Sequence, residues 1–497
     1  MPSLPVRALV LLSIAAAVPL RAQTPQIAAD RPLTLEEAMT IAFEKNLNLK
    51  IQTNQNESSK ENFKITEANF DPQFTAGLTR NMSIAASNTS ALDGRVPNHS
   101  NGTNISLEGS KLLGATNGTL TARVTASRSS STSSNNLFDP QYNNGVSLSL
   151  NQPINTFGRA AAYYNLDRAR IGLTINNYTY TNQILTLISN VENAYYNLVT
   201  ARETLAIRQR SANLSQVSLD ESRTRRQAGT VIDLDVSSAE LSYARAQNAI
   251  LQAQQTVRDA EDALLLILNT GDFNVRPGPV QFRDYTDGVP SFAEAYKQAR
   301  DRYPTTNSQE LTIKQLELDL DNARRNLRPN VRINGSMGYN ALTSNESYWD
   351  AIDNLPSRNG RNWSLGATYT IPWGRKAEKA RFRVAQIGLE NGKLTLAQLE
   401  QELIRQVRVA VSTIETNIAA VQIAANATAH AERQYEQQKA RFDSGVATSL
   451  LVLQAQDTLE STRNSELVAK LTLRRAYSEL QRLTGASFER YNIQPPQ

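Results

Sequence analysis

The stretch Gly229–Ile267 decides the fold because it occurs twice in the chain; its sequence is GTVIDLDVSSAELSYARAQNAILQAQQTVRDAEDALLLI. After the glycine, apolar or small residues follow one another in alternating steps of three and four. These residues are Val236, Ala239, Tyr243, Ala246, Ile250, Ala253, Val257, Ala260, Leu264 and Ile267. A spacing of 3.5 residues is that of a coiled-coil seam. The pattern therefore predicts a long helix from the turn at Gly229 to about Leu268.

The second copy of this stretch lies 216 residues further along, where Gly445 takes the place of Gly229. Eight of its ten seam positions are again apolar, and Thr462 and Glu466 are the exceptions. The helix before each glycine follows the same offset: Val191, Ala194, Leu198 and Leu205 correspond to Val407, Ala410, Ile414 and Val421. The sequence therefore predicts one long helical hairpin that has been duplicated.

Composition and charge exclude several classes of protein. The 497 residues carry a formal net charge of +5, but Lys and Arg alternate with Asp and Glu, and no basic arm indicates a nucleic-acid partner. The chain has no cysteine, which excludes a disulfide framework, a thiolate metal site and a lipidated N-terminal cysteine. We expect neither a cofactor nor a bound metal.

The N-terminus has the pattern of a secretory signal peptide over residues 1–22. Arg7 precedes the apolar run Ala8–Leu20, and Ala22 offers a small residue for cleavage before Gln23. Beyond this segment, no apolar run approaches the roughly 20 residues that a membrane-spanning helix requires. A mature protein that crosses a membrane must therefore do so with β-strands.

Two tandem repeats of helix, strand, strand and helix account for most of the chain. The predicted segments are a first repeat over 33–271, a connector over 272–290, a second repeat over 291–485 and a tail over 486–497. Each repeat opens with a capping-box pattern, Thr34–Glu37 in the first and Ser291–Glu294 in the second. The first of these helices is expected to run unbroken to about Asn69, since Pro72 disfavours helical geometry in the residue before it.

Between the helices, apolar residues alternate with polar ones, as expected of strands with one face in lipid and one in water. Such alternation occurs at Phe74–Leu78, Val146–Leu150, Val331–Tyr339 and Trp363–Ile371. After the last strand of each repeat, a helix of about 70 residues leads to Gly229 or Gly445, and 1.5 Å per residue makes it about 100 Å long.

The first repeat is 38 residues longer than the second between its helices. In this surplus, Ile105–Leu112 and Thr119–Ala126 alternate around the turn Gly114–Gly118, which predicts an extra hairpin over about residues 103–128. The Ser- and Asn-rich stretch Ser127–Asn144 is predicted to be a loop. The hairpin could add strands to a barrel or fold over its outer mouth, and the sequence leaves both possibilities open.

Aromatic residues gather near the second pair of strands. They are Trp349, Trp363, Trp373, Tyr339 and Tyr369. The cluster fits an aromatic girdle at a membrane interface, and it fits equally the ordinary preference of strands for aromatic residues.

The number of strands has a consequence for assembly. Four or six strands cannot close a barrel, because the smallest barrels have about eight, and lipid does not tolerate an open sheet edge. The protomers must then share one barrel in a ring. We therefore predict an α+β membrane protein, in which a shared transmembrane β-barrel continues into a long α-helical coiled-coil tunnel.

Five stretches, in this order and spacing, resemble the TolC-like outer-membrane efflux protein family, the outer membrane factors. They are Leu33–Ala38 (LTLEEA), Leu150–Gly158 (LNQPINTFG), Val191–Leu198 (VENAYYNL), Arg225–Gly229 (RRQAG) followed by Asp235 and Val236, and Arg441–Gly445 (RFDSG). The resemblance implies a homotrimer whose barrel lies in the outer-membrane lipid of a Gram-negative-type bacterium and whose helices extend through the periplasm. It implies a periplasmic adaptor and an inner-membrane efflux pump or secretion transporter as partners.

The function implied by the resemblance is that of an exit duct in a tripartite efflux system, which passively conducts small molecules to the exterior. An exit channel for type I protein secretion is an alternative within the family. A non-pore secreted coiled-coil scaffold is an alternative of another class, and amphipathic strands bracketed by prolines count against it.

The resemblance also implies roles for the hairpin turns. Gly229 with Thr230, and Gly445 with Val446, would form the periplasmic tip that opens and that the adaptor contacts. A simpler interpretation, compatible with the first, is that both glycines only end helices.

Six residues near these turns are gate candidates. Family gates often carry carboxylates six and nine residues after the second glycine, but here these positions are Leu451 and Gln454, so a hydrophobic or amide constriction would replace an acidic ring. The family lock pairs an Asp with an Arg two residues after the second glycine; Asp235 matches, but its partner position is Ala447.

Other pairings of the gate candidates stay open. Asp233 or Asp235 could pair with Arg441, next to Phe442. The favoured alternative is that Asp233 completes a capping box that begins at Thr230.

Catalysis finds no support in the sequence. The only histidines, His99 and His430, are 331 positions apart, in an expected loop and an expected helix, and neither a zinc site nor a Ser–His pair has further support. Paired carboxylates such as Asp319 and Asp321 are better explained as helix charges. We predict that the protein is not an enzyme.

Overall fold

The computed structural model describes residues 31–85, 98–132, 139–271, 275–281, 288–343, 360–491 and 493. The expected signal peptide, Trp349 and parts of the expected connector lie outside these residues. The chain divides into two compact units. The helical unit comprises Met1–Leu47, Leu187–Asp287 and Asn417–Arg475, and the sheet unit comprises Asn48–Thr186, Gly288–Thr416 and Ala476–Gln497.

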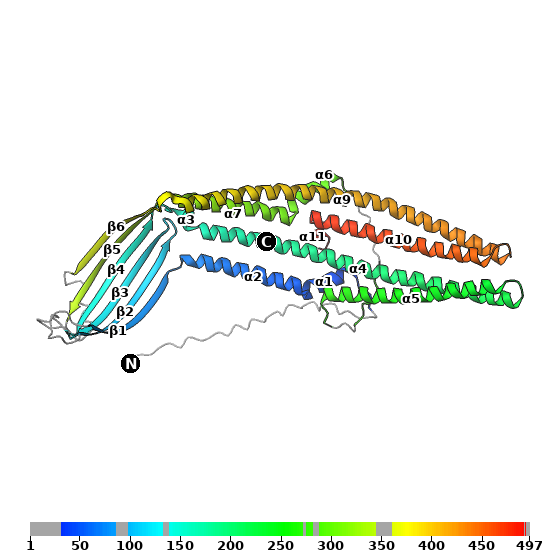
Figure 1. Cartoon of the computed structure of the whole chain (residues 1–497), viewed down its shortest axis with the longest axis horizontal. Coiled ribbons are helices and arrows are strands. Elements are labelled where there is room, and N and C mark those ends of the chain that lie inside the picture. Colours follow the sequence, from blue (N-terminus) through cyan, green and yellow to red (C-terminus); the bar gives the residue numbers. More distant parts are fainter. Residues whose placement is uncertain are drawn as a thin grey trace, which may run out of the picture. The chain divides into compact units, whose positions relative to one another are not determined.

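Long helices make up most of both units (Figure 1). The α-helices are α1 (Leu35–Lys45), α2 (Leu47–Glu67), α3 (Arg159–Ala162), α4 (Tyr164–Gln227), α5 (Asp233–Leu268), α6 (Phe292–Arg302), α7 (Pro304–Asn326), α9 (Lys376–Asp443), α10 (Ser449–Thr484) and α11 (Ala486–Arg490). Short 3-10 turns cover Ala68–Phe70 and Trp373–Arg375. Within the described ranges, no helix combines the length and the apolar character needed to traverse a bilayer.

The duplicated hairpins are α4 with α5 and α9 with α10, as predicted (Figure 1). Every seam residue of α5 and α10 is buried or half-buried; Ala239, Leu264 and Leu483 have no exposed surface at all. The corresponding stripe of α4 is equally buried at Val191 and Leu198. Burial along a stripe only one or two residues wide stabilises a helix pair without a thick core, which explains the ordinary apolar fraction of the chain.

The start of each repeat has the predicted capping box. The Thr34 hydroxyl accepts a hydrogen bond from the Glu37 amide and the Glu37 carboxylate accepts one from the Thr34 amide, both at 3.2 Å. Ser291 and Glu294 make the same pair of bonds at 3.3 and 3.1 Å. Each box therefore satisfies two amide groups that the first helical turn leaves without a partner.

The prediction of one unbroken helix to Asn69 is wrong. The helix ends at Lys45 and restarts at Leu47, because Asn46 adopts an extended backbone conformation and its side chain donates to the Ile267 carbonyl at 2.8 Å. The side-chain amide of Asn269 in turn donates to the Lys45 carbonyl at 3.0 Å. Side-chain amides thus replace the helical hydrogen bonds that the break removes.

Six antiparallel strands form one sheet in chain order (Figure 1). They are β1 (Gln73–Ala85), β2 (Asn98–Leu113), β3 (Gly118–Ser131), β4 (Gln141–Pro153), β5 (Asn330–Thr343) and β6 (Arg361–Thr370). The strands of the predicted extra hairpin are present as β2 and β3, and they pair with β1 and β4.

The predicted loop over Ser127–Asn144 is wrong at both ends. β3 continues to Ser131 and β4 begins at Gln141, and the Ser127 hydroxyl donates to the Asn143 carbonyl at 2.9 Å across the two strands. A polar composition suggested a loop, but ladder hydrogen bonds come from the backbone and tolerate polar side chains on a wet face. His99 likewise lies in β2 and not in a loop.

The register of the ladder separates the sheet into an apolar and a polar face. One row across the strands consists of Ala76, Leu107, Val124, Val146, Tyr339 and, at the end of β6, Arg361. The next row on this face consists of Phe74, Gly109, Ala122, Leu148, Met337 and Trp363. The intervening row on the other face consists of Thr75, Glu108, Arg123, Ser147, Gly338 and Asn362.

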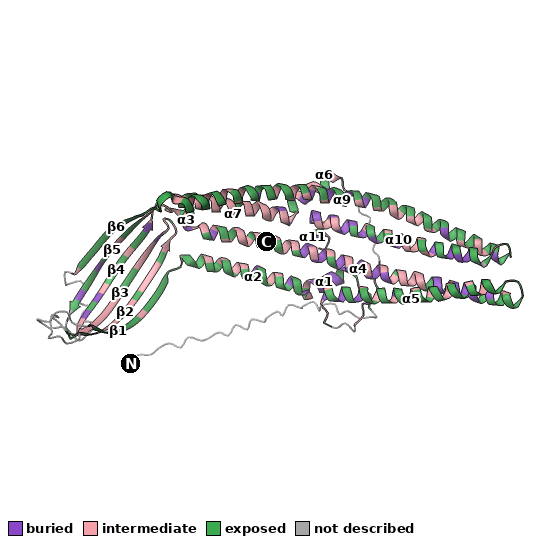
Figure 2. Ribbon diagram, in the orientation of Figure 1, coloured by how far each residue is buried: buried purple, intermediate pink, exposed green. Residues whose placement is uncertain are grey.

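The apolar face is exposed within one chain. Phe74 is 85% and Trp363 is 79% exposed, and the outer strands β1 and β6 are exposed along most of their length (Figure 2). A monomeric water-soluble protein rarely exposes so large a continuous apolar surface. The alternation therefore predicts an apolar surrounding on one side of the sheet and water on the other.

Candidate functional site at the hairpin turns

The two hairpin turns of the helical unit have the same backbone geometry. Gly229 and Gly445 have φ values of +71° and +74°, a region that side chains disfavour. The Gly229 amide donates to the Arg226 carbonyl at 3.0 Å, and the Thr230 amide donates to the Arg225 carbonyl at 2.9 Å. This pair of bonds is a Schellman motif, so Gly229 ends its helix as the simpler interpretation predicted.

The second turn repeats the motif. The Gly445 amide donates to the Phe442 carbonyl at 3.0 Å, and the Val446 amide donates to the Arg441 carbonyl at 2.9 Å. Val446 is 70% exposed, which leaves an apolar side chain at the turn free for contact. The periplasmic role of these turns stays a prediction.

Arg225 joins the two turns. Its guanidinium donates to the Phe442 carbonyl at 3.0 Å, lies 3.4 Å from the Asp443 carboxylate and sits 3.9 Å from the centroid of the Phe442 ring. Phe442 is only 4% exposed, so the ring is packed beneath the charge. Three different interactions thus hold the end of α4 against the end of α9.

Arg225 is not among the gate candidates that the sequence predicts, although it lies in the RRQAG stretch that resembles the family. Arg225 and Arg441 occupy equivalent places 216 residues apart, so the duplication marks the position. The duplication does not show that the two arginines differ in their contacts: Arg441 is exposed, whereas Arg225 contacts the other hairpin.

The two acidic gate candidates have partners other than Arg441. Both carboxylate oxygens of Asp233 accept hydrogen bonds from Arg226, at 2.5 and 3.1 Å. These bonds hold the pKa of Asp233 below its usual value. The Asp235 carboxylate accepts from the Ile232 amide at 3.3 Å.

The favoured capping box from Thr230 to Asp233 is therefore wrong. Helix α5 begins at Asp233 with Ile232 at the N-cap, so the residue that reaches back is Asp235. The Thr230 hydroxyl donates to the Arg225 carbonyl at 2.9 Å instead. The helix starts two residues later than predicted, so Asp235 and not Asp233 is the aspartate whose side chain accepts from the N-cap amide.

A cavity of about 520 Å³ lies in the helical unit beyond the turns, between α4, α5 and α10. Polar and charged residues from all three helices line it, among them Arg208, Arg245, Gln454, Asp457 and Glu460. Gln454, predicted as a constriction residue, thus lines a hollow, and the neighbouring candidate Leu451 is 42% exposed.

Two acidic residues line this cavity, Glu460 and Asp457, and Asp457 lies one helical turn beyond Gln454. Although Asp457 is exposed in one chain, partial desolvation raises the pKa of its carboxyl, and the positive charge of Arg245 opposes that rise. Glu460 is paired with Arg208 and accepts a hydrogen bond from the Ser211 hydroxyl. Asp457 is not among the predicted gate residues, although it follows Leu450 and Gln454 and precedes Ser461 in steps of three and four, away from the seam.

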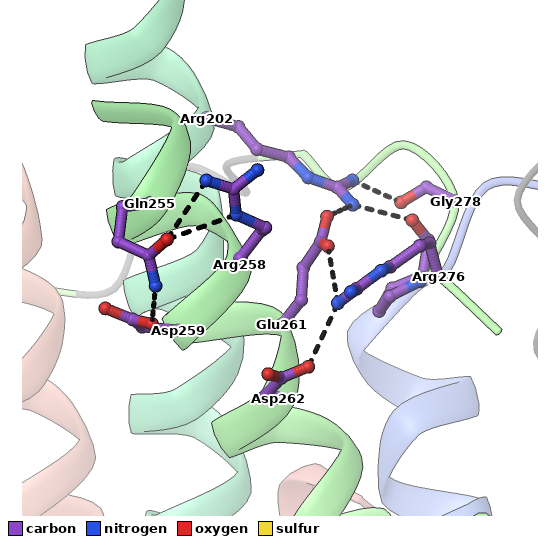
Figure 3. Close-up of polar contacts among 9 residues, drawn as sticks. Arg202, Gln255, Arg258, Asp259, Glu261, Asp262, Arg276 and Gly278 are labelled. Atoms are coloured by element: carbon purple, nitrogen blue, oxygen red, sulfur yellow. Dashed lines mark hydrogen bonds and ion pairs between the residues drawn. The ribbon is translucent and has the colours of Figure 1, made fainter. Parts of the chain in front are cut away.

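A second polar cluster anchors the chain after α5 to the helical unit (Figure 3). Arg202 of α4 donates to Glu261 at 2.7 Å and to the carbonyls of Pro277 and Gly278 at 2.6 and 2.5 Å. Arg276 donates to the other oxygen of Glu261 at 3.3 Å. Glu261 is 7% exposed, so its charge is compensated by two guanidinium groups.

The described residues hold no group of three or more His, Asp or Glu side chains placed to bind a metal ion.

The sequence matches a known protein family over most of its length. The model of a family described as outer membrane efflux protein matches residues 117–270 and 295–486. The chain is 23% identical over 309 residues to the outer membrane protein TolC of Salmonella enteritidis, and 22% identical over 303 residues to that of Escherichia coli (strain K12). These matches cover 60% and 58% of this chain, and the chain spans 60% and 59% of the two relatives.

Solved structures share the fold at low sequence identity. The Campylobacter jejuni CmeC outer membrane channel matches with a TM-score of 0.70 and 14% identity, over 98% of this chain and 94% of that one. A membrane protein from Pseudomonas aeruginosa matches with a TM-score of 0.68 and 18% identity, over 92% and 91%.

Proposed function

Because this chain belongs to the outer membrane efflux protein family, we propose that it is the outer-membrane exit duct of a tripartite efflux system. It passively conducts small molecules from a periplasmic adaptor and an inner-membrane pump to the exterior. The observation that carries the proposal is the two-faced sheet, joined in one chain to duplicated helical hairpins.

The sheet supplies the wall in the membrane. Its apolar face, with Phe74, Leu107 and Trp363, contacts lipid, and its face of Thr, Ser and Asn residues contacts water. Since lipid does not satisfy backbone hydrogen bonds, the outer edges of β1 and β6 are closed by further copies. A homotrimer with one shared barrel meets this requirement.

The hairpin turns supply the periplasmic end. Gly229, Thr230, Gly445 and Val446 form the tip that the adaptor contacts, since they present open space and an exposed apolar side chain there. The contact of Arg225 with Phe442 holds neighbouring hairpins together in the closed tip.

Charge in the cavity tunes what passes. Asp457 takes the place of the acidic groups that Leu451 and Gln454 lack, and Arg245 limits its effect. The duct supplies no energy of its own, so transport direction comes from the pump.

Planar-bilayer recording of detergent-purified protein tests the proposal, with the oligomer mass measured in the same preparation. We expect discrete channels from a trimer. A soluble monomer or dimer that never conducts would contradict the proposal. Closed trimers are distinguished by the Arg225→Ala variant, which should conduct if the tip is the barrier.

A further inference from the structure

We propose that three copies close an eighteen-stranded barrel, in which the β2–β3 hairpin is part of the wall and widens the lumen. The inference rests on the proposed function, because it takes from it the sharing of one barrel by three copies. It adds the number of strands, the surface by which copies meet and the chemistry of the lumen.

The hairpin is continuous with the sheet on both sides. The ladder between β1 and β2 runs from Gln73 with Ser110 to Ala85 with Asn98, and the ladder between β3 and β4 runs from Thr119 with Asn151 to Ser129 with Gln141. Strands of 16 and 14 residues exceed the roughly 9–11 residues that cross a bilayer with tilt. Both strands are therefore long enough to span the membrane.

The hairpin also obeys the division into two faces. Leu107 and Val124 face each other on the apolar side, and Glu108 and Arg123 face each other on the polar side. The charged pair has its closest atoms 3.2 Å apart. A hairpin folded over the mouth of the duct would have no reason to keep this alternation, because neither of its faces would meet lipid.

The turn of the hairpin lies at the end of the sheet where the strands pass into helices. The Gln152 side chain donates to the Thr116 carbonyl at 2.8 Å, and the Asn117 side chain donates to the Thr156 carbonyl at 3.2 Å. The Gly158 amide also donates to Thr116, at 3.3 Å. This anchorage places the turn opposite the outer mouth, and it decides between the two paths that the sequence left open.

The free edges of the sheet fit a second copy of the chain. β1 and β6 run antiparallel to each other, and each pairs on one side only among the described strands. Both edges keep the division of faces, with Thr75 and Ser364 on the polar side and Phe74 and Trp363 on the apolar side. An antiparallel ladder between β6 of one copy and β1 of the next therefore continues both faces.

Three sheets of six strands make eighteen. Because the diameter of a barrel grows about linearly with strand number, this barrel is about half as wide again as one with four strands from each copy. Barrels of 16–18 strands leave an aqueous channel. The lumen is lined mainly by Thr, Ser and Asn, with three Glu108–Arg123 pairs and, where the strands approach the helices, three Arg332 side chains, which fits bulky polar or amphipathic solutes.

Cysteine cross-linking tests the strand count, since the chain has no cysteine of its own. Within one copy, β1 and β6 are five strand spacings apart, about 24 Å, and β1 and β4 are three apart, about 14 Å, so neither pair can form a disulfide. The control pair is S336C with S364C, whose hydroxyls are 2.7 Å apart on adjacent strands.

We expect T75C combined in turn with S364C and T368C to link copies into dimers and trimers in native membranes, and T75C with S147C to form no link. A link between T75C and S147C would overturn the strand count, because β4 would then be the direct neighbour of β1, while the shared barrel would stand. If the control forms and no β1–β6 pair links copies, the shared barrel itself fails, and with it the proposed function.

A deletion provides an independent measurement. β1 and β4 are antiparallel and carry their apolar residues at positions of the same parity, so replacing residues 86–140 by an Asn-Gly turn lets them pair directly. In this background the two-residue turn pairs Ala85 with Gln141 and so places Thr75 opposite Asn151, and T75C with N151C should now form a disulfide within one copy. A trimer in which this pair does not form would contradict the assignment of β2 and β3 to the wall.

Discussion

The guanidinium of Arg225 lies 3.9 Å from the centroid of the Phe442 ring and donates to the carbonyl of the same residue, so the first hairpin turn is fastened to the second. The two residues are 217 positions apart in the chain. Because water is excluded from the buried ring, the attraction between the charge and the ring is stronger than it would be at an exposed site.

Arg225→Ala should loosen the tip. Loss of the cation–π contact and the charged hydrogen bond is expected to cost about 1–2 kcal/mol, roughly a tenfold shift toward the open state. Arg441→Ala, at the equivalent place in the second repeat, is the matched control because its side chain is exposed. Open probability in planar bilayers is the measurement, and equal effects of the two substitutions would refute the role of Arg225.

Charge near the cavity should set ion selectivity. Gln454→Asp and Leu451→Asp are expected to raise the cation-to-anion permeability ratio, and Asp457→Asn to lower it, each by up to about fivefold, because a unit charge about 4 Å from an ion in water contributes about 1 kcal/mol. Reversal potentials in a salt gradient give the ratio. Unaltered selectivity in all three variants would place the constriction elsewhere.

The selectivity should also depend on pH. Since partial desolvation raises the pKa of Asp457, this carboxyl takes up a proton at a higher pH than an aspartate in free solution does. Because the folded state disfavours the charged form of this carboxyl, the stability of the protein rises as pH falls from the raised pKa toward the ordinary pKa of aspartate. The carboxylate loses its charge in the same pH range, so cation selectivity falls there. In Asp457→Asn, reversal potentials should show no such fall in cation selectivity over this pH range. A fall that persists in the variant would come from another titrating group.

Arg202→Met should destabilise the helical unit. It removes a partner from the buried Glu261, and an uncompensated buried charge costs about 3–5 kcal/mol, which the remaining Arg276 reduces. Arg258→Met is the control, because Arg258 contacts only Gln255 among the residues drawn in Figure 3. Faster proteolysis near Pro277 in the first variant alone is the expected result, and similar rates in both would show that the cluster is not an anchor.

The Glu108–Arg123 pair should behave as a cross-strand pair. Glu108→Arg places two like charges opposite each other and is expected to destabilise the sheet by about 0.2–1 kcal/mol, and adding Arg123→Glu should restore it. Heat resistance of the trimer on denaturing gels is the measurement. If the double variant is no better than the single one, the two side chains do not face each other.

Periodicity made the helices and the strands predictable. The 3.5-residue stripe from Val236 to Ile267 and the alternation at Phe74–Leu78 each follow from one face of an element being buried or apolar. The loop expected at Ser127–Asn144 failed because composition cannot distinguish a loop from a strand whose side chains face water.

The candidate site was less predictable, because its contacts join distant segments. Arg225 meets Phe442 across two hairpins, and Asp457, whose pKa is raised by partial desolvation, lines a cavity that α4, α5 and α10 form together. The exchange of roles between Asp233 and Asp235 came from a two-residue difference in a helix start, which sequence patterns do not resolve.

Single-particle imaging of the purified protein in lipid nanodiscs tests most directly whether the sheet is a shared wall between lipid and water. We predict a three-fold particle whose closed barrel lies inside the disc, with six strands from each copy and Phe74 and Trp363 turned toward lipid. A particle whose sheet lies outside the disc, or a single copy with open sheet edges, would contradict the account.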